Sequence, residues 1–146
     1  MDIFSTSPKD RLFDAGLLIL RVTVSCFLLT HGLGKLTTLM GSEPIQFADP
    51  FGMGQTTSLA LTVFAEVVCA FLIILGLLTR LAAIPIIIVM LVAFFYIHMA
   101  DAFGVKEMSG LYLVVYVFIA IAGPGRYSID NLISKRRNKV NYYTTT

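Results

Sequence analysis

Four long apolar stretches in the sequence restrict the chain to a small set of folds. They cover residues 15–33, 58–78, 81–99 and 106–123, and each is close to the roughly 20 residues that a helix needs to cross a bilayer core. Hydrophobic residues make up 57% of the 146 residues and charged residues only 14%, a composition too apolar for a soluble domain of this size. The sequence therefore predicts an all-α integral membrane protein, with a single four-helix domain over residues 1–133.

The connections between these stretches predict how the helices are arranged. Only "TR" separates the second stretch from the third, which leaves room for a tight turn between antiparallel neighbours. Between the first and second stretches lies a long segment rich in Gly and Pro, which we expect to fold as a cap over one end of the bundle. A helix-start signature of Ser7, Pro8 and Asp10 predicts that the first helix begins before residue 15.

The C-terminal region changes character after residue 123. The segment "GPGRYS" is expected to end the fourth helix, because proline cannot continue a helix and glycine accepts a turn. Ser128 is placed to cap a short interfacial helix through "IDNLISKRR". We expect the basic tail, residues 134–146, to be a disordered cytoplasmic segment.

Lysine and arginine are distributed unevenly between the two sides of the predicted bundle. Apart from Arg21, eight of them lie on the side of the termini and only Lys35 and Lys106 on the opposite side. Because cytoplasmic loops carry the excess of positive charge, both termini are expected in the cytoplasm. The same rule accounts for the "KRRNK" cluster, which we interpret as an orientation signal rather than a site for anionic lipid. No nucleic-acid motif is visible, so the expected partner of this surface is the lipid bilayer.

The two cysteines, Cys26 and Cys69, lie within apolar stretches and lack the CxxC spacing of a redox or metal motif. We expect both thiols to be buried and reduced, with a role in packing. Whether either takes part in redox chemistry stays open at the level of the sequence.

Two charged residues lie deep within the predicted spans. Glu66 stands in "TVFAEVVCAF" and Arg21 stands in the first stretch. Charges at such depth are costly unless they turn inward and pair. If the first helix runs outward and the second returns, the two side chains come within reach of each other. We therefore expect an Arg21–Glu66 ion pair, which serves either as a clamp between helices or as a ligand or proton site.

A second group of ionisable residues is predicted to share one depth, at the mouth of the bundle opposite the termini. Its members come from three helices: His31, Lys35, His98, Asp101, Lys106 and Glu107. Each alone is explained by a position in the wet interface, whereas together, beneath the long loop, they favour a vestibule with residues that proton relays use. The spacing of His31 and His98 fits no local ligand pattern, so we predict no metal site.

Several short motifs occur together in an order that is similar to one family. They are an arginine in the first span, "HGLGKL" at 31–36, "AE" at 65–66, "GLLTRLAA" at 76–83, Met90, His98, Glu107 and "GPGRYSID" at 123–130. Over residues 15–133 this combination resembles the DoxX family of small bacterial membrane proteins. The resemblance implies a four-helix protein of the bacterial inner membrane. The family takes its name from a subunit of an archaeal terminal quinol oxidase, and other members are linked with oxidative-stress or sulfur-handling membrane complexes.

Three functions are compatible with these residues, and whether the protein is itself an enzyme stays open. The first is a quinone- or quinol-linked accessory subunit of a membrane redox complex. No haem, flavin or iron–sulfur signature is visible, so a quinone is the expected ligand and a partner redox protein the expected source of electrons. The alternatives are a non-catalytic scaffold for a partner enzyme and a conduit for a small molecule or lipid. The conduit would need a homo-oligomer, because four helices leave little internal space.

The first function predicts which side chains meet the ligand. The expected ligand-binding residues are Arg21, His31, Lys35, Glu66, His98 and Glu107. Among them, Glu66, Arg21 and His98 are the candidates for a direct catalytic role, because a quinone head needs hydrogen-bonding groups and a route for protons.

Overall fold

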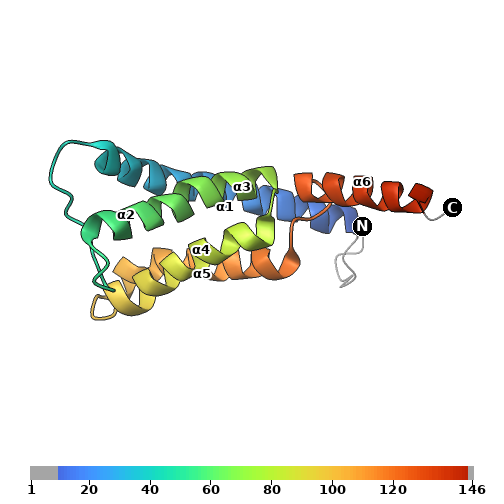
Figure 1. Ribbon diagram of the computed structural model, residues 1–146. Helices are drawn as coiled ribbons and strands as arrows, with labels where there is room; N and C mark the ends of the chain where they lie inside the picture. The colour runs from blue at the N-terminus through green and yellow to red at the C-terminus, as the bar shows by residue number, and fades with distance from the viewer. Residues whose placement is uncertain (1–9, 145–146) are drawn as a thin grey trace.

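The computed structural model describes residues 10–144, and the regular elements in that range are helical (Figure 1). Four helices are long and apolar enough to cross a membrane, which confirms the predicted all-α membrane fold. Ser7 and Pro8 of the predicted helix start lie outside the described residues.

In chain order, the first span is α1 (Asp10–Met40). The second span consists of α2 (Gln55–Val63), η1 (Phe64–Cys69) and α3 (Ala70–Leu75). The third consists of α4 (Thr79–Val92) and η2 (Ala93–Ile97), and the fourth is α5 (Phe103–Ala122). A last helix, α6 (Ile129–Thr144), follows the fourth span.

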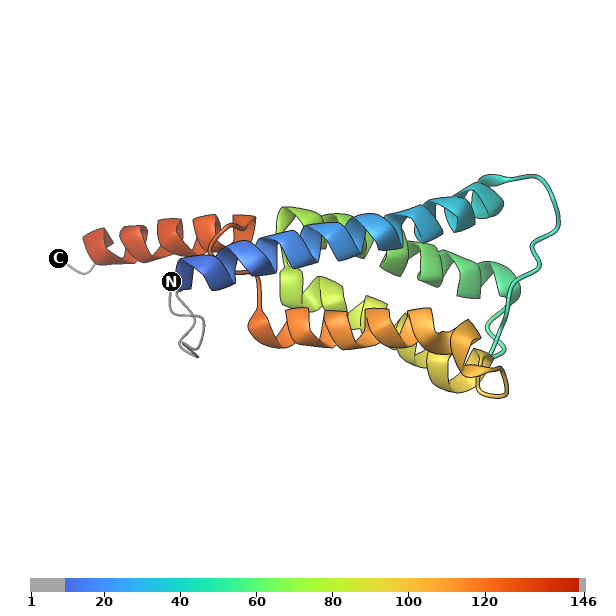
Figure 2. The same cartoon turned by 180° about the vertical axis from the view of Figure 1, so that it is seen from behind.

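The four spans form two pairs of helices. α1 packs along α2 and α3, α4 packs along α5, and contacts of η1 and α3 with α4 join the pairs. Figures 1 and 2 show one end of the bundle covered by the loop of residues 41–54 and the turn at 98–102, which we call the loop end. The opposite end, with the connections at residues 76–78 and 123–128, is the turn end. From the turn end the two pairs diverge towards the loop end (Figure 1).

The half of the bundle nearer the turn end has a tightly packed core. Ala65, Ala70 and Ala83 are fully buried where η1, α3 and α4 meet, and Ile73 and Ile86 fill the space between them. Small side chains let helix backbones approach closely. In lipid, helices associate through such van der Waals packing, because the hydrophobic effect provides no driving force there. This packing holds η1, α3 and α4 together in the turn-end half of the bundle.

The two cysteines lie in different surroundings. Cys69 is buried in the core, as predicted, whereas Cys26 is exposed on the outside of α1, so the prediction of a buried thiol was wrong there. The reason is the face of α1: the preceding residue, Ser25, points inward and hydrogen-bonds the Tyr116 hydroxyl (3.1 Å), which turns Cys26 out of the bundle.

Two of the spans contain π-helical segments, η1 and η2, which the sequence analysis did not predict. In η2, for example, the His98 N–H donates to the carbonyl of Ala93, five residues earlier (3.0 Å). Such a segment shifts the side chains around it relative to an uninterrupted α-helix, and these segments occur frequently at functional sites. η1 contains Glu66 and η2 ends beside His98, so both lie next to candidate site residues.

At the turn end, the segments "GLLTR" and "GPGRYSID" bind each other. Gly76 (φ 68°) and Leu78 (φ 51°) both adopt left-handed backbone in the connection between α3 and α4. The Asp130 carboxylate accepts hydrogen bonds from the N–H groups of Leu78 (2.8 Å) and Thr79 (3.0 Å) and from the Thr79 hydroxyl (3.1 Å). The first N–H groups of a helix have no partner within it. Asp130 therefore caps α4, and its own N–H donates to the Gly76 carbonyl (2.9 Å).

Arg21 is buried against this same connection. Its guanidinium donates to the carbonyl of Tyr127, and it lies so close to Gly76 that a Cβ at that position would collide with it. A glycine is thus required at position 76 by both the positive φ and the arginine. We call the group formed by Arg21, Gly76, Thr79, Tyr127 and Asp130 the turn-end lock.

The C-terminal helix differs from what the sequence analysis expected. The Ser128 hydroxyl accepts a hydrogen bond from the Asn131 N–H (3.2 Å), so Ser128 caps α6 as predicted. The helix then continues to Thr144, through most of the tail that we expected to be disordered; its cap and the Leu, Lys and Arg residues of its first half favour helix. Figures 1 and 2 show α6 extending away from the bundle, roughly along its long axis rather than across its end.

We predict that Asp130→Ala destabilises the protein by about 1–3 kcal/mol, because the buried start of α4 loses its cap. Thermal unfolding in detergent, followed by circular dichroism, measures this effect. The matched control is Glu43→Ala, which removes an exposed carboxylate of the 41–54 loop and should leave the unfolding temperature unchanged. Equal unfolding temperatures for the two variants would contradict a capping role for Asp130.

Candidate functional site

A cavity of about 460 Å³ lies at the loop end, between the two helix pairs. Its volume falls within the range of about 300–1,000 Å³ that is typical of small-molecule sites. Most of its wall is apolar, and its polar side chains are those of His31, Lys35, Ser58, Thr62, Glu66, His98, Ser109 and Tyr112. We call this cavity the loop-end pocket.

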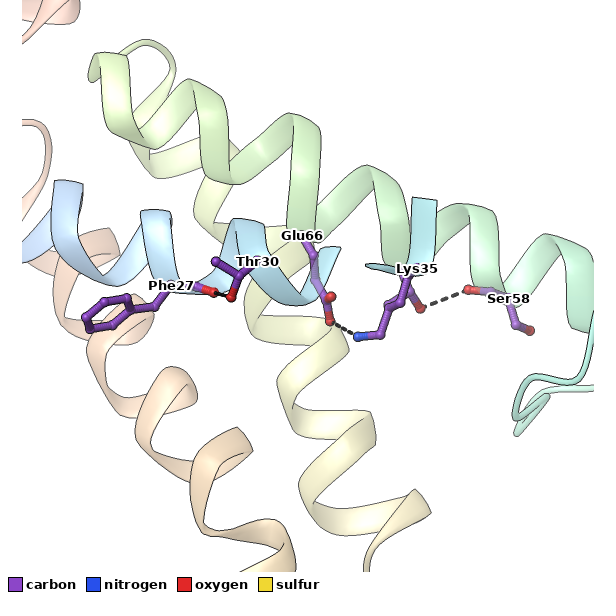
Figure 3. A network of polar contacts seen from close by, with 6 residues as sticks. Phe27, Thr30, Lys35, Ser58 and Glu66 are labelled. Atoms are coloured by element: carbon purple, nitrogen blue, oxygen red, sulfur yellow. Dashed lines mark hydrogen bonds and ion pairs between the residues drawn. The ribbon is translucent and has the colours of Figure 1, made fainter. Parts of the chain in front are cut away.

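Glu66 and Lys35 form an ion pair in the wall of the pocket, with 2.5 Å between Lys35 Nζ and Glu66 Oε1 (Figure 3). The Glu66 side chain is 3% exposed and that of Lys35 is 32% exposed. The other carboxylate oxygen, Glu66 Oε2, is buried and has no hydrogen-bond partner in the described part of the chain. Such an unsatisfied buried acceptor is rare in folded proteins and calls for an explanation.

Gly32 brings the two helices close enough for this pair to form. A Cβ at position 32 would lie 2.9 Å from both the carbonyl carbon and the Cβ of Glu66, and 2.8 Å from Val67 Cγ2. The backbone of α1 therefore passes directly against η1 at this point. Because residues three apart lie on one face of a helix, Lys35 is held above the contact and reaches Glu66.

The predicted Arg21–Glu66 pair was wrong, and the length of α1 explains why. The sequence analysis ended the first span at residue 33, but α1 continues to Met40. This extension places Gly32, rather than Arg21, opposite Glu66. Lys35 lies 14 positions after Arg21, about 21 Å along a helix, which separates the guanidinium from the pocket. Arg21 therefore belongs to the turn-end lock.

The other predicted site residues divide into those that line the pocket and those that do not. His31 and His98 both line it, as do Lys35 and Glu66, so these four predicted residues do come together. Glu107 is exposed on α5 and does not line the pocket. Lys106 turns to the carbonyl of Met99 (3.2 Å) and also lies outside the lining.

At the mouth of the pocket, His98 is held by a nearby acid. Its Nδ1 lies 2.7 Å from Asp101 Oδ2, and both side chains are partly exposed. This pair connects a pocket residue to the surface, because His98 lines the cavity and Asp101 faces outward. Histidine paired with a carboxylate is suited to taking up and passing on protons near neutral pH.

The loop of residues 41–54 forms the roof of the pocket. Phe51 stacks on Tyr96 of η2 with 6.2 Å between ring centroids, and Phe51 itself lines the cavity. The loop is anchored by Asp49, which accepts hydrogen bonds from the Ser58 hydroxyl (2.8 Å) and from the Gly54 N–H (2.8 Å). The bond from Ser58, followed by the bonds from backbone N–H groups, lowers the pKa of Asp49, so this anchor stays ionised.

Tyr112 is a pocket residue whose role the sequence analysis did not predict. Its ring meets His31 edge-on, with centroids 6.1 Å apart, and stacks on Tyr116 below it (6.4 Å). Tyr116 is fully buried and hydrogen-bonds Ser25, so the line of rings runs from the pocket into the core. The spacing of Tyr112 and Tyr116 along α5 indicates a shared face but cannot show that this face borders a cavity.

The composition of the pocket limits the chemistry that it supports. Within the described residues, no group of three or more His, Cys, Asp or Glu side chains is placed to hold a metal ion. The polar groups that converge include one ammonium, one carboxylate with a free oxygen, and a histidine–tyrosine contact. An apolar cavity with a few converging hydrogen-bonding groups is suited to a largely apolar molecule with a polar head.

Comparisons with known proteins agree with the membrane architecture. The DoxX family model matches residues 16–99, a region that contains Gly32, Lys35, Glu66 and His98. "Inner membrane protein YqjF" of Escherichia coli strain K12 is 30% identical over 130 residues, which cover 86% of this chain and 98% of that protein. "Uncharacterized membrane protein Rv3486" of Mycobacterium tuberculosis is 32% identical over 137 residues, with 78% of this chain and 83% of that protein covered. No solved structure matches this chain.

We predict that Gly32→Ala destabilises the protein by about 1–3 kcal/mol, because the added methyl group collides with the backbone of η1. Gly34→Ala is the matched control, since a Cβ at position 34 meets nothing within 4 Å. Thermal unfolding of the two variants in detergent tests the close approach of α1 and η1. A Gly32→Ala protein as stable as Gly34→Ala would show that the two helices do not touch there.

A second prediction concerns the ion pair. Lys35→Met should lower the free energy of unfolding by about 2–3 kcal/mol, because Glu66 is left buried without its partner. The loss is smaller than for a fully buried pair because Lys35 is partly exposed. The double variant Lys35→Met/Glu66→Gln should recover much of this loss, because no unpaired charge remains. A double-mutant cycle measured by thermal unfolding checks the coupling, and additive effects of the two changes would argue against it.

Proposed function

The chain belongs to the DoxX family, and on this premise we propose that it is a quinone- or quinol-binding accessory subunit of a membrane redox complex. It is a multi-pass membrane protein with a relative named as an inner membrane protein. The observation that carries the proposal is the loop-end pocket, in which the part-buried Lys35–Glu66 ion pair stands in a largely apolar wall.

The ion pair offers the two hydrogen-bonding functions that a quinone head requires. Lys35 can donate to a carbonyl oxygen of the head, and the free Glu66 Oε2 can accept from a hydroxyl of the reduced form. A bound quinone would supply the redox chemistry, which the protein side chains do not provide. The chain itself binds and orients the head, excludes water with its apolar wall, and holds a proton acceptor at Glu66.

Protons need a route between the pocket and water. His98 borders the pocket and lies against the surface acid Asp101. This pair is suited to carry protons at the outer end of such a route. His31, in edge contact with Tyr112, lies at the same end of the bundle. In this proposal Glu66 is the inner proton-carrying group and His98 the outer one.

We further propose that both termini face the cytoplasm of the bacterial cell. Among the described residues outside the bundle core, Arg11, Arg80, Arg126 and the lysines and arginines of α6 lie at the turn end and beyond it. Lys35 and Lys106 are near the loop end, and Lys35 is paired with Glu66. In this orientation the loop-end pocket faces the non-cytoplasmic side of the inner membrane. The electrons would pass between the bound quinone and a partner redox protein.

A non-catalytic scaffold is the second candidate, favoured by the turn-end lock. The lock fixes the start of α6 on the bundle, and α6 extends away from it where a partner enzyme could bind. In that case the Lys35–Glu66 pair would only clamp α1 to η1. A conduit through one chain is disfavoured by the buried core between the pocket and the turn end, where Ile73 and Ile86 are fully buried.

Binding of a short-chain quinone to purified protein in lipid nanodiscs tests the proposal. We expect saturable binding, and Glu66→Gln should weaken binding of the reduced form by about tenfold or more, the equivalent of one charge-assisted hydrogen bond. Glu43→Gln, which alters an acid outside the pocket, is the control and should bind like the parent. Absence of saturable binding by the folded parent, or equal affinity for parent and Glu66→Gln, would favour the scaffold instead.

A further inference from the structure

The wall of the loop-end pocket changes from buried to exposed between α2 and α4. Its inner wall is formed by Leu28, Glu66 and Met90, which are 1%, 2% and 4% exposed. On the other side it reaches Leu61 of α2 and Ile88 of α4, which are 51% and 53% exposed. Side chains that line a pocket and also form the outer surface mark where the pocket opens. One opening of the loop-end pocket therefore lies sideways, between α2 and α4.

This opening lies deep in the membrane. Ile88 is nine residues from each end of the span Thr79–Ile97, so it stands at the middle of the third membrane crossing. At 1.5 Å per residue it is about 13 Å from either end, well inside a hydrocarbon core about 30 Å thick. Glu66 lies near the middle of its own span, Gln55–Leu75, at a similar depth. A molecule in the opening is therefore surrounded by lipid acyl chains.

The side of the pocket towards the loop end is bordered by apolar side chains. They include Phe47, Pro50 and Phe51, and Phe51, although 61% exposed, is stacked on Tyr96. A strongly polar, water-soluble ligand would have to pass these apolar side chains. The apolar border at the loop end, together with the depth of Leu61 and Ile88 in their spans, favours entry of the ligand from lipid.

We propose that the ligand of the loop-end pocket is an amphipathic molecule with a long hydrocarbon tail, which reaches the pocket from the bilayer through the opening between α2 and α4. Its polar head lies at the Lys35–Glu66 pair, and its tail leaves across Leu61 and Ile88 into the acyl chains. This inference rests on the proposed function, because it takes a quinone-type head as the group that meets the ion pair. It adds that the tail contributes to binding and that the lipid phase is the source of the ligand.

The test compares a long-tailed quinone with a tailless head-group analogue in nanodiscs, using a variant that narrows the opening. Ile88→Trp should weaken binding of the long-tailed quinone by about tenfold while changing binding of the tailless analogue by less than about threefold. Ile84→Trp is the matched control: Ile84 is 49% exposed, one helical turn earlier on α4, and does not line the pocket. Leu61→Trp, with Phe64→Trp as its control, repeats the experiment from α2.

The possible results separate this inference from the proposed function. Selective loss of the long-tailed ligand in Ile88→Trp and Leu61→Trp supports the opening. If the tailless analogue binds the parent but tail length and both tryptophans make no difference, the opening is overturned and the head-group site stands. If neither ligand binds the folded parent, the proposed function fails and this inference fails with it. Circular dichroism melting of each variant confirms that the protein compared is folded.

Discussion

The close contact between α1 and η1 at Gly32 is the constraint on which the rest of the site depends. Only a residue without a side chain allows the two backbones to touch there, and that contact sets Lys35 over Glu66. The pairing in turn makes a carboxylate tolerable in the middle of a membrane span, because its charge is compensated within the bundle. Without this contact, the pocket would lose the ion pair in its wall.

The two ends of the bundle have opposite physical characters. At the turn end, Asp130, Arg21 and Gly76 hold the α3–α4 connection and the start of α6 in one arrangement, with backbone groups as the main partners. At the loop end the helix pairs diverge, π-helical segments interrupt two spans, and a loop covers the space between them. A rigid end and an open end in one small bundle let the protein hold a cavity without losing its packing.

Hydropathy alone was sufficient to predict the four spans, because only long helices satisfy an apolar sequence in lipid. The partner of Glu66 could not be predicted in the same way. The segment after residue 33 contains glycine and polar residues, as loops often do, yet it forms the last two turns of α1. As a result Lys35, and not Arg21, is the residue that pairs with Glu66. His31 and His98 were correctly grouped because both stand near the same ends of their helices. Tyr112 was missed, since a helical spacing cannot distinguish a ring in the core from one that borders a cavity.

The cap of α4 has a consequence for the way the chain is synthesised. The N–H groups of Leu78 and Thr79 are satisfied by a carboxylate that lies 52 and 51 residues further along. Because the chain is synthesised from its N-terminus, the hairpin formed by the second and third spans is made before the residue that caps its connection. Its left-handed backbone at Leu78 gains its partner only when residue 130 leaves the exit tunnel. Asp130, which follows the fourth span in the sequence, thus completes the tight connection between the second and third spans.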